Sequence, residues 1–359
     1  MADSLTAVTR HFVDSLQVPG LAVGVWRGES LVFATGLGVT SLTGGAPVTE
    51  RTLFHMASVT KPFVATAIMQ LVEQGRVGLD QPVTAYLPYF RMKDKRARTI
   101  TIRQLLGHLA GMPDVTDYRW NHPEYDDGSL ERYVRGLSDS TLIAAPGAVW
   151  QYSNIGFEVL ADVIAKVSGQ PFETYVQQHI LTPLRMSKST LLMTDIDSTL
   201  MAWGHSRDSA GRYRRNVDYP YNRRHAASST LHSNVDDMLR WARANLRRGE
   251  LDGARILEAP SYDEMWKPGR DLMATLGARA KQAGVAMPYD SLAVGLSWLL
   301  ATKRGRHLVM HSGGDEGFRT DLLLAPDEGI GIVVLVNGDR ADPGALANRL
   351  MDLVAKPRL

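Results

Sequence analysis

The strand-like and helix-like segments of this chain are separated along its length, and this separation constrains the fold more than any other feature. Short apolar runs typical of β-strands lie near both ends, whereas helical patterns fill the middle. The predicted strands cover residues 21–26, 31–34, 293–300, 307–311, 319–324 and 330–336. Predicted helices over residues 5–16 and 343–354 can supply one covering layer. The two ends of the chain are therefore expected to form a single sheet.

The expected fold is a mixed α/β (α+β) arrangement: an antiparallel sheet flanked by helices, built from both chain ends, plus an all-helical lobe. Residues 332–336 form an almost uninterrupted apolar run, which suits a sheet covered on both faces. A chain of 359 residues also exceeds the usual size of one hydrophobic core. We expect a discontinuous sheet domain of residues 1–77 and 291–359, a mainly helical domain of residues 78–290, and a site in the cleft between them.

Ser58-Val59-Thr60-Lys61 is the only Ser-x-x-Lys in the sequence. Apolar residues recur at helical spacing after Lys61 until Gly75, so Ser58 is expected to open a helix. The free N–H groups and the positive dipole end at such a position favour an oxyanion. Lys61 follows one turn later, where its amine can reach the Ser58 hydroxyl and act as a base. Because the motif arises by chance about once in a chain of this size, it needs further support.

Two more motifs supply that support. Tyr152-Ser153-Asn154 precedes a helix-like run over residues 155–167, which places a phenol and a carboxamide at a helix start. His311-Ser312-Gly313-Gly314 is expected to end a strand, where a glycine pair allows substrate or backbone to approach closely. Each motif alone is equally compatible with ordinary packing or a turn. The order and spacing of all three favour a catalytic set.

In order and spacing these motifs resemble those of the serine β-lactamase and penicillin-binding-protein superfamily. The Tyr-x-Asn form of the second motif is similar to the class C branch, which includes family VIII carboxylesterases and D,D-peptidases. The resemblance covers about residues 18–337. The third motif departs from typical class C β-lactamases, because His311 stands where lysine is usual and Ser312 replaces the commoner threonine. His-led triplets are associated with peptidase and esterase members.

The resemblance implies an acyl-enzyme on Ser58, with Lys61 and Tyr152 as the catalytic partners. Either a neutral lysine amine or a tyrosinate that Lys61 stabilises could accept the serine proton. The backbone N–H groups of Ser58 and Gly314 would form the oxyanion hole. Asn154, Ser312 and Gly313 are expected to contact substrate. His311, charged at lower pH, could steer a substrate carboxylate or bond to Tyr152.

Two loops are candidates for shaping the substrate pocket. An aromatic-rich stretch over residues 117–125 contains Tyr118, Trp120 and Tyr125, any of which could wall the acyl pocket. Packing against the helical lobe explains each of them equally well. A basic stretch over residues 212–224 is interpreted as a solvated loop rather than a rim for anionic substrates. Ser228, Ser229 and His225 have no partner that the sequence identifies.

Composition excludes several other classes of function. The formal net charge of +2 is too small for a nucleic-acid footprint, and the absence of cysteine rules out disulfides, thiol catalysis and thiolate metal ligands. The sequence has no His-Glu-x-x-His, no Gly-x-Ser-x-Gly elbow and no phosphate-binding glycine loop. No metal, cofactor or nucleic-acid partner is therefore expected.

The first ten residues lack the basic and apolar segments of a signal peptide, and no apolar run reaches membrane-spanning length. If the chain is complete, we expect a cytoplasmic protein without a membrane partner. The expected function is a carboxylesterase that acts on short-chain esters. The alternatives are a D,D-peptidase, D-amino-acid amidase or β-lactamase acting on small-molecule amides, and a penicillin-binding sensor that is acylated without turnover. The oligomeric state is left open.

Overall fold

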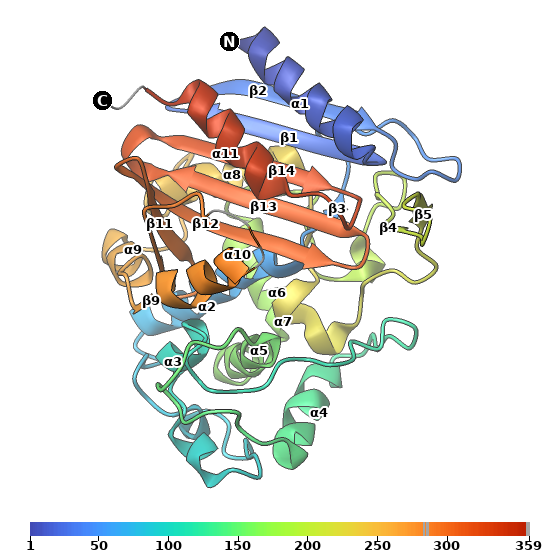
Figure 1. Ribbon diagram of the computed structural model, residues 1–359. Coiled ribbons are helices and arrows are strands. Elements are labelled where there is room, and N and C mark those ends of the chain that lie inside the picture. The colour runs from blue at the N-terminus through green and yellow to red at the C-terminus, as the bar shows by residue number, and fades with distance from the viewer. Residues whose placement is uncertain (283, 285–286, 357–359) are drawn as a thin grey trace.

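The computed structural model describes residues 1–282, 284 and 287–356. Its main element is an eight-stranded antiparallel sheet in the order β2-β1-β14-β13-β12-β11-β10-β9 (Figure 1). The strands are β1 Gly20–Arg27, β2 Ser30–Gly38, β9 Arg270–Asp271, β10 Ser291–Val294, β11 Leu299–Lys303, β12 Arg306–Asp315, β13 Phe318–Ala325 and β14 Ile330–Val336. The N-terminal hairpin joins the C-terminal strands where β1 pairs with β14, from Leu21↔Val336 to Arg27↔Ile330. The predicted antiparallel sheet built from both chain ends is therefore confirmed.

Helices cover both faces of this sheet. Helices α1 (Ala2–Leu16) and α11 (Pro343–Val354) pack side by side on one face, in front of the strands in Figure 1. Helix α8 (Val235–Leu246) covers the other face and approaches β1 so closely that a Cβ on Gly24 would lie 2.4 Å from Val235. All seven residues of β14 are buried as a result, in agreement with their continuous apolar run.

The other helices lie mostly below the sheet in Figure 1. They are α2 Lys61–Glu73, α3 Ile102–Leu106, α4 Ser129–Gly136, α5 Asn154–Ser168, α6 Phe172–Val176, α7 Ala226–Ser229, α9 Ala259–Met265 and α10 Ala278–Gln282. Three small antiparallel pairs accompany them: β3 (Phe54–His55) with β6 (His232–Ser233), β4 (His205–Arg207) with β5 (Tyr213–Arg215), and β7 (Glu250–Leu251) with β8 (Ala254–Arg255). Helices α2 and α5 pack against each other and begin at the motif residues Lys61 and Asn154.

Two strand predictions were wrong. The run over residues 293–300 is not one strand, because the chain turns between β10 and β11. Gly295 permits this turn, since a Cβ there would lie 2.2 Å from the carbonyl oxygen of Met265. The third motif does not end a strand either, because β12 continues to Asp315, and Gly313 and Gly314 pair with Thr320 and Arg319 of β13.

The C-terminal part of the sheet begins earlier in the chain than expected. Strand β9 pairs with β10 through Ala293↔Asp271 and Val294↔Arg270, although its two residues precede the predicted domain boundary at residue 291. The division into a sheet domain and a helical domain stays a prediction.

Candidate active site

Ser58 lies in a short 3-10 turn, Ala57–Thr60, that leads directly into α2. The turn packs against β12 so tightly that a Cβ on Gly313 would lie 2.4 Å from the Met56 carbonyl oxygen and 3.0 Å from the Ser58 backbone nitrogen. The Thr320 hydroxyl of β13 donates to the same Met56 oxygen at 2.8 Å. Two strands of the sheet therefore hold the backbone around Ser58.

The Lys61 side chain is fully buried, and its amine meets three oxygen atoms. Nζ lies 2.9 Å from Ser58 Oγ, 2.6 Å from Asn154 Oδ1 and 2.8 Å from the carbonyl oxygen of Ser228. A charged amine can donate to all three. A neutral amine has two hydrogens, which the Asn154 and Ser228 oxygens accept, so its lone pair is left for the Ser58 hydroxyl. The geometry suits Lys61 to remove the proton from Ser58.

Tyr152 precedes α5, and its ring lies beside the Lys61 amine. Nζ is 5.1 Å from the centroid of the Tyr152 ring, on which the imidazole of His108 stacks at 4.2 Å. Within the described part of the chain the Tyr152 hydroxyl makes no hydrogen bond. Because Tyr152 also lines the cavity at Ser58, this hydroxyl is available to a bound molecule.

Asn154 is the first residue of α5, behind the N-cap Ser153, whose hydroxyl accepts from Gly156 N–H at 3.3 Å. Its carboxamide oxygen faces Lys61, and its amide nitrogen donates to Asp114 Oδ1 at 3.0 Å. We expected Asn154 to hold a substrate oxygen. In the structure both ends of its carboxamide already have partners inside the protein.

The third motif forms one wall of the site. Strand β11 pairs with β12 only as far as Leu299↔Met310, so no strand among the described residues pairs with residues 311–315 on that side. His311, Ser312 and Gly314 line the cavity there, whereas Gly313 is not among the lining residues. The strand end is tied to β3 by a 2.7 Å bond between His55 Nε2 and Asp315 Oδ2.

His311 is neutral in this site. Burial, reinforced by the charge of Lys61, lowers the pKa of His311 to about 3. The expected charge at lower pH would therefore require a pH near 3. Its Nδ1 lies 2.7 Å from the Ser312 carbonyl oxygen, which can only accept, so Nδ1 carries the hydrogen and Nε2 is an acceptor. His311 offers the site a lone pair and no positive charge.

His108 is a second neutral imidazole beside the site. Burial, followed by the charge of Lys61, holds its pKa well below the ordinary value. Its Nδ1 accepts from Ser153 N–H at 3.2 Å, so the hydrogen is on Nε2, which has no partner among the described residues. His108 thus supports the ring of Tyr152 without adding charge.

Three residues at the cavity have a strained backbone conformation. Ala57, His108 and Ser297 have φ values of 47°, 56° and 71°, in the left-handed region that disfavours residues with a Cβ. Such a conformation costs roughly 1–2 kcal/mol per residue. Ala57 precedes Ser58 directly, and the other two residues line the cavity. Non-glycine residues held in this region are often found at functional sites.

The cavity at Ser58 has a volume of about 320 Å³, and both polar and apolar side chains line it. Tyr118 lines it, while Trp120 stacks on Tyr118 at 5.0 Å and is not a lining residue. Tyr125 stacks on Tyr221 instead. The lining residues are Ser58, His108, Tyr118, Trp150, Tyr152, Asn154, Leu276, Val294, Ser297, Leu299, His311, Ser312, Gly314 and Asp315.

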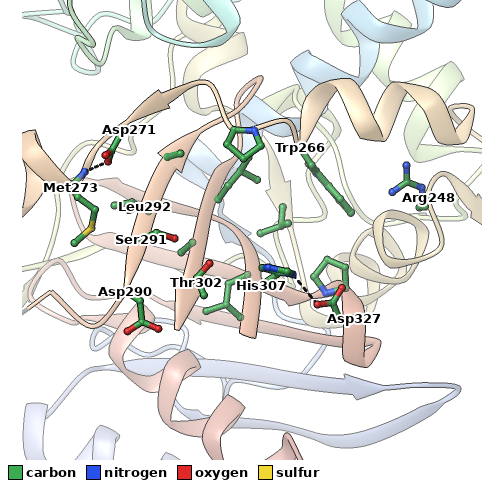
Figure 2. A pocket seen from close by; sticks show the side chains of 17 residues that line it. Arg248, Trp266, Asp271, Met273, Asp290, Ser291, Leu292, Thr302, His307 and Asp327 are labelled. Atoms are coloured by element: carbon green, nitrogen blue, oxygen red, sulfur yellow. Dashed lines mark hydrogen bonds and ion pairs between the residues drawn. The ribbon is translucent and has the colours of Figure 1, made fainter. Parts of the chain in front are cut away.

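A larger cavity of about 670 Å³ lies on the sheet away from these residues (Figure 2). Ser291 and Thr302, cross-strand neighbours of β10 and β11, lie along it, and Trp266 stands at one side. At its edge His307 Nδ1 pairs with Asp327 at 3.0 Å. No residue of the three motifs lines this cavity. We therefore assign the candidate chemistry to the smaller cavity, which Ser58 and Tyr152 line.

The basic stretch has structural partners. Arg223 makes a buried ion pair with Glu173, with Nε 2.8 Å from Oε1, and Arg224 pairs with Glu124. Arg215 lies over the ring of Trp203 at 3.7 Å. None of these arginines is a lining residue of the Ser58 cavity. Within the described residues, no group of three or more His, Cys, Asp or Glu side chains could hold a metal ion.

Sequence reasoning missed the residues that act through the backbone or across long sequence distances. Ser228 contributes its carbonyl oxygen to Lys61, 167 residues away, and this role leaves no mark on residue type. Asp114 reaches Asn154 across 40 residues. The only available signal was position, since Asp114 directly follows the turn-forming residues Gly111, Met112 and Pro113.

The fold and site agree with comparisons to known proteins. The model of the Beta-lactamase family matches residues 5–356, so this chain belongs to that family. Protein flp from Staphylococcus aureus (strain MW2) is 27% identical over 93% of this chain and 62% of its own length. Esterase EstB from Burkholderia gladioli is 30% identical over 64% of this chain and 61% of its own length. This chain thus spans less than two thirds of the curated relatives it matches.

Among solved structures, the octameric penicillin-binding protein homologue from Pyrococcus abyssi superposes with a TM-score of 0.85 at 24% identity. The match covers 99% of this chain and 77% of that protein, and it shows that the fold is shared. Among the described residues no helix is both long and apolar enough to span a membrane.

Proposed function

We propose that this protein is a serine hydrolase that forms an acyl-enzyme on Ser58 and acts chiefly on short-chain carboxylic esters. The observation that carries the proposal is the Lys61 amine, 2.9 Å from Ser58 Oγ and held by two other acceptors. A serine hydroxyl is a weak nucleophile at its ordinary pKa and needs such a base.

In the first step Ser58 Oγ attacks the ester carbonyl carbon while its proton passes to neutral Lys61. The carbonyl oxygen becomes an oxyanion, for which the N–H groups of Ser58 and Gly314 are the proposed donors; losing one such donor costs roughly 3 kcal/mol. The carbon–oxygen bond to the leaving alcohol then breaks, and the alcohol oxygen takes a proton through the Tyr152 hydroxyl. Water, activated by the same pair of side chains, releases the carboxylic acid and restores Ser58.

Three observations favour esters over β-lactams and amides. His311 is neutral, so the site lacks the permanent cation that a lysine would offer to a β-lactam carboxylate. The Asn154 carboxamide is engaged by Lys61 and Asp114, so it is not free for the amide oxygen of a substrate. The wall formed by Trp150, Leu276 and Leu299 is apolar and suits a short acyl chain. EstB, a relative that is named as an esterase, also supports an activity on esters.

The test is a hydrolysis panel with purified protein and p-nitrophenyl esters, nitrocefin and D-alanyl peptides. We expect the highest kcat/KM on short-chain esters, and at least a roughly 10³-fold loss in Ser58→Ala with the fold intact. Mass spectrometry after a fluorophosphonate probe should place the adduct on Ser58. Labelling of another serine, or full activity of the alanine variant, would reject the mechanism. A single burst without continued turnover would instead indicate an acylated sensor.

A further inference from the structure

A loop far from Ser58 in sequence wraps around the start of α5. The Ser153 hydroxyl donates to the Pro113 carbonyl oxygen at 2.6 Å, and Ser153 N–H donates to His108 Nδ1 at 3.2 Å. Gln151 N–H donates to the His108 carbonyl oxygen at 2.9 Å. The segment that carries Tyr152 and Asn154 is thereby fixed to residues 108–114.

Asp114 is the last residue of this loop, and its carboxylate accepts hydrogen bonds from Asn154. Asp114 Oδ1 accepts from the Asn154 backbone N–H at 2.8 Å and from its Nδ2 at 3.0 Å, and Oδ2 lies 3.3 Å from the same Nδ2. Val115 N–H also donates to Oδ1, at 2.8 Å. Asp114 therefore contacts both the backbone and the side chain of Asn154.

The ionised carboxylate decides how the Asn154 carboxamide is oriented. A carboxylate can only accept hydrogen bonds, so the NH₂ end of Asn154 must face Asp114. The oxygen end must then face Lys61, where Nζ lies at 2.6 Å. If the carboxamide were reversed, its NH₂ group would face an amine and its oxygen would face a carboxylate.

We propose that Asp114 is a positioning residue of the hydrolytic site, acting through Asn154 to aim the Lys61 amine at Ser58. Asp114 is not a lining residue of the cavity, so it acts without touching substrate. With Asn154 Oδ1 and the Ser228 carbonyl oxygen fixed, the lone pair of neutral Lys61 has one remaining direction, toward Ser58 Oγ. This inference rests on the proposed function.

The acceptor oxygens of Asp114 give the positioning role its own readout. Asp114→Asn keeps one acceptor oxygen for the Asn154 N–H groups, whereas Asp114→Ala keeps none. If orientation of the carboxamide matters, activity should follow the remaining acceptor, and kcat should fall more than KM rises. A purely structural role would instead make the loss of activity follow the loss in the free energy of unfolding.

The experiment compares two variants with a matched control. Asp114→Ala removes both acceptor oxygens, and we expect a roughly 10²-fold lower kcat/KM on p-nitrophenyl acetate, mainly through kcat. Asp114→Asn keeps one acceptor oxygen, so the loss should be less than about tenfold. Asp117→Asn changes an exposed carboxylate that accepts from Arg119 N–H, and it should leave kcat and KM unchanged. Urea unfolding of all three variants measures any loss of stability.

The rate at which a fluorophosphonate labels Ser58 provides a second readout, because it reports activation of the nucleophile without the substrate. Slow labelling of Asp114→Ala, with normal labelling of Asp117→Asn, supports the proposal. Equal labelling and equal kcat/KM in wild type, Asp114→Asn and Asp114→Ala would overturn it, as would a loss of activity that only follows the loss of stability. If wild type neither hydrolyses esters nor labels at Ser58, the proposed function fails and the role of Asp114 fails with it.

Discussion

At the scale of single residues, the contacts of the Lys61 amine determine what it can do. Besides Ser58 Oγ it contacts two oxygen atoms, one from Asn154 of α5 and one from Ser228 of α7, and these helices hold both in place. The Tyr152 ring lies beside the amine, and no hydrogen bond links the two side chains within the described residues. In the proposed mechanism, Lys61 and Tyr152 therefore act in successive steps of one proton transfer.

We therefore predict that Lys61→Ala and Tyr152→Phe each lower kcat/KM on esters by at least about 10²-fold. The double variant should lose much less than the product of the two single losses, because both residues serve the same proton path. A double-variant cycle on p-nitrophenyl acetate measures this coupling. Losses that multiply would show that the two residues act independently.

A second prediction concerns His311 and selectivity. Because its pKa is lowered to about 3, the imidazole stays neutral between pH 5 and 8, so the ratio of kcat/KM for esters to that for β-lactams should not change over this range. His311→Lys introduces a cation and should shift the ratio toward penicillins and cephalosporins. Measuring kcat/KM for esters and for β-lactams in wild type and in His311→Lys tests this prediction. An unchanged ratio in the variant would reject the role of His311.

At the scale of elements, the site depends on the contact between β12 and the turn that carries Ser58. Gly313 is what allows this contact, because any side chain there would meet the Met56 carbonyl oxygen and the Thr320 hydroxyl at 2.4 Å. The same strand presents Gly314 to the cavity, where β11 leaves its edge open. A small displacement of β12 would therefore change the distance between the two proposed oxyanion donors.

We predict that Gly313→Ala lowers the free energy of unfolding by about 1–3 kcal/mol, as for overpacked sites, and lowers kcat more than it raises KM. Urea unfolding and steady-state kinetics on the same preparation measure both effects. Gly136→Ala in α4 is the matched control, because a Cβ at Gly136 has no atom within 4 Å. Wild-type kcat in Gly313→Ala would argue against an oxyanion hole built from this strand.

At the scale of the whole molecule, a buried carboxyl group lies between the sheet and the start of α11. Asp321 of β13 is buried, and desolvation, with a smaller effect of Asp342, raises its pKa to about 8. Asp342 caps α11 by accepting from Ala345 N–H at 3.0 Å. Oδ1 of each carboxyl group would lie 3.4 Å from a Cβ on Gly344. Asp321 is therefore uncharged in the folded protein near neutral pH.

This carboxyl links folding stability to pH. The unfolded chain releases the Asp321 proton near 3.8, whereas the folded protein keeps it up to about 8, so stability falls as pH rises between these values. We predict that Asp321→Asn, which cannot ionise, gains stability relative to wild type by about 1.4 kcal/mol per pH unit as pH rises from 5 to 7. Urea unfolding at both pH values measures it. A pH-independent difference would contradict the prediction.

The sequence predicted those helices and strands whose positions follow from the local spacing of apolar residues. The spacing of Ser58 and Lys61 places both side chains at one helix start, and the periodicity of residues 330–336 and 343–354 gave a strand and a helix with those bounds. It failed at residues 293–300, where an apolar run fits a strand equally well whether or not the chain turns at Gly295. Only the carbonyl oxygen of Met265, supplied by a distant segment, makes that glycine necessary.

The sequence alone determined the family and the residue types of the site, because motif order and helical spacing depend on the covalent chain. Only the tertiary structure decided which partners those residues have: Asn154 lies 93 residues from Lys61, and the Ser228 carbonyl 167 residues. The structure also decided that His311 is neutral, since its pKa depends on burial and on the nearby Lys61 charge. Hydrogen-bond partners and pKa values arise from distance and desolvation, which linear order does not contain.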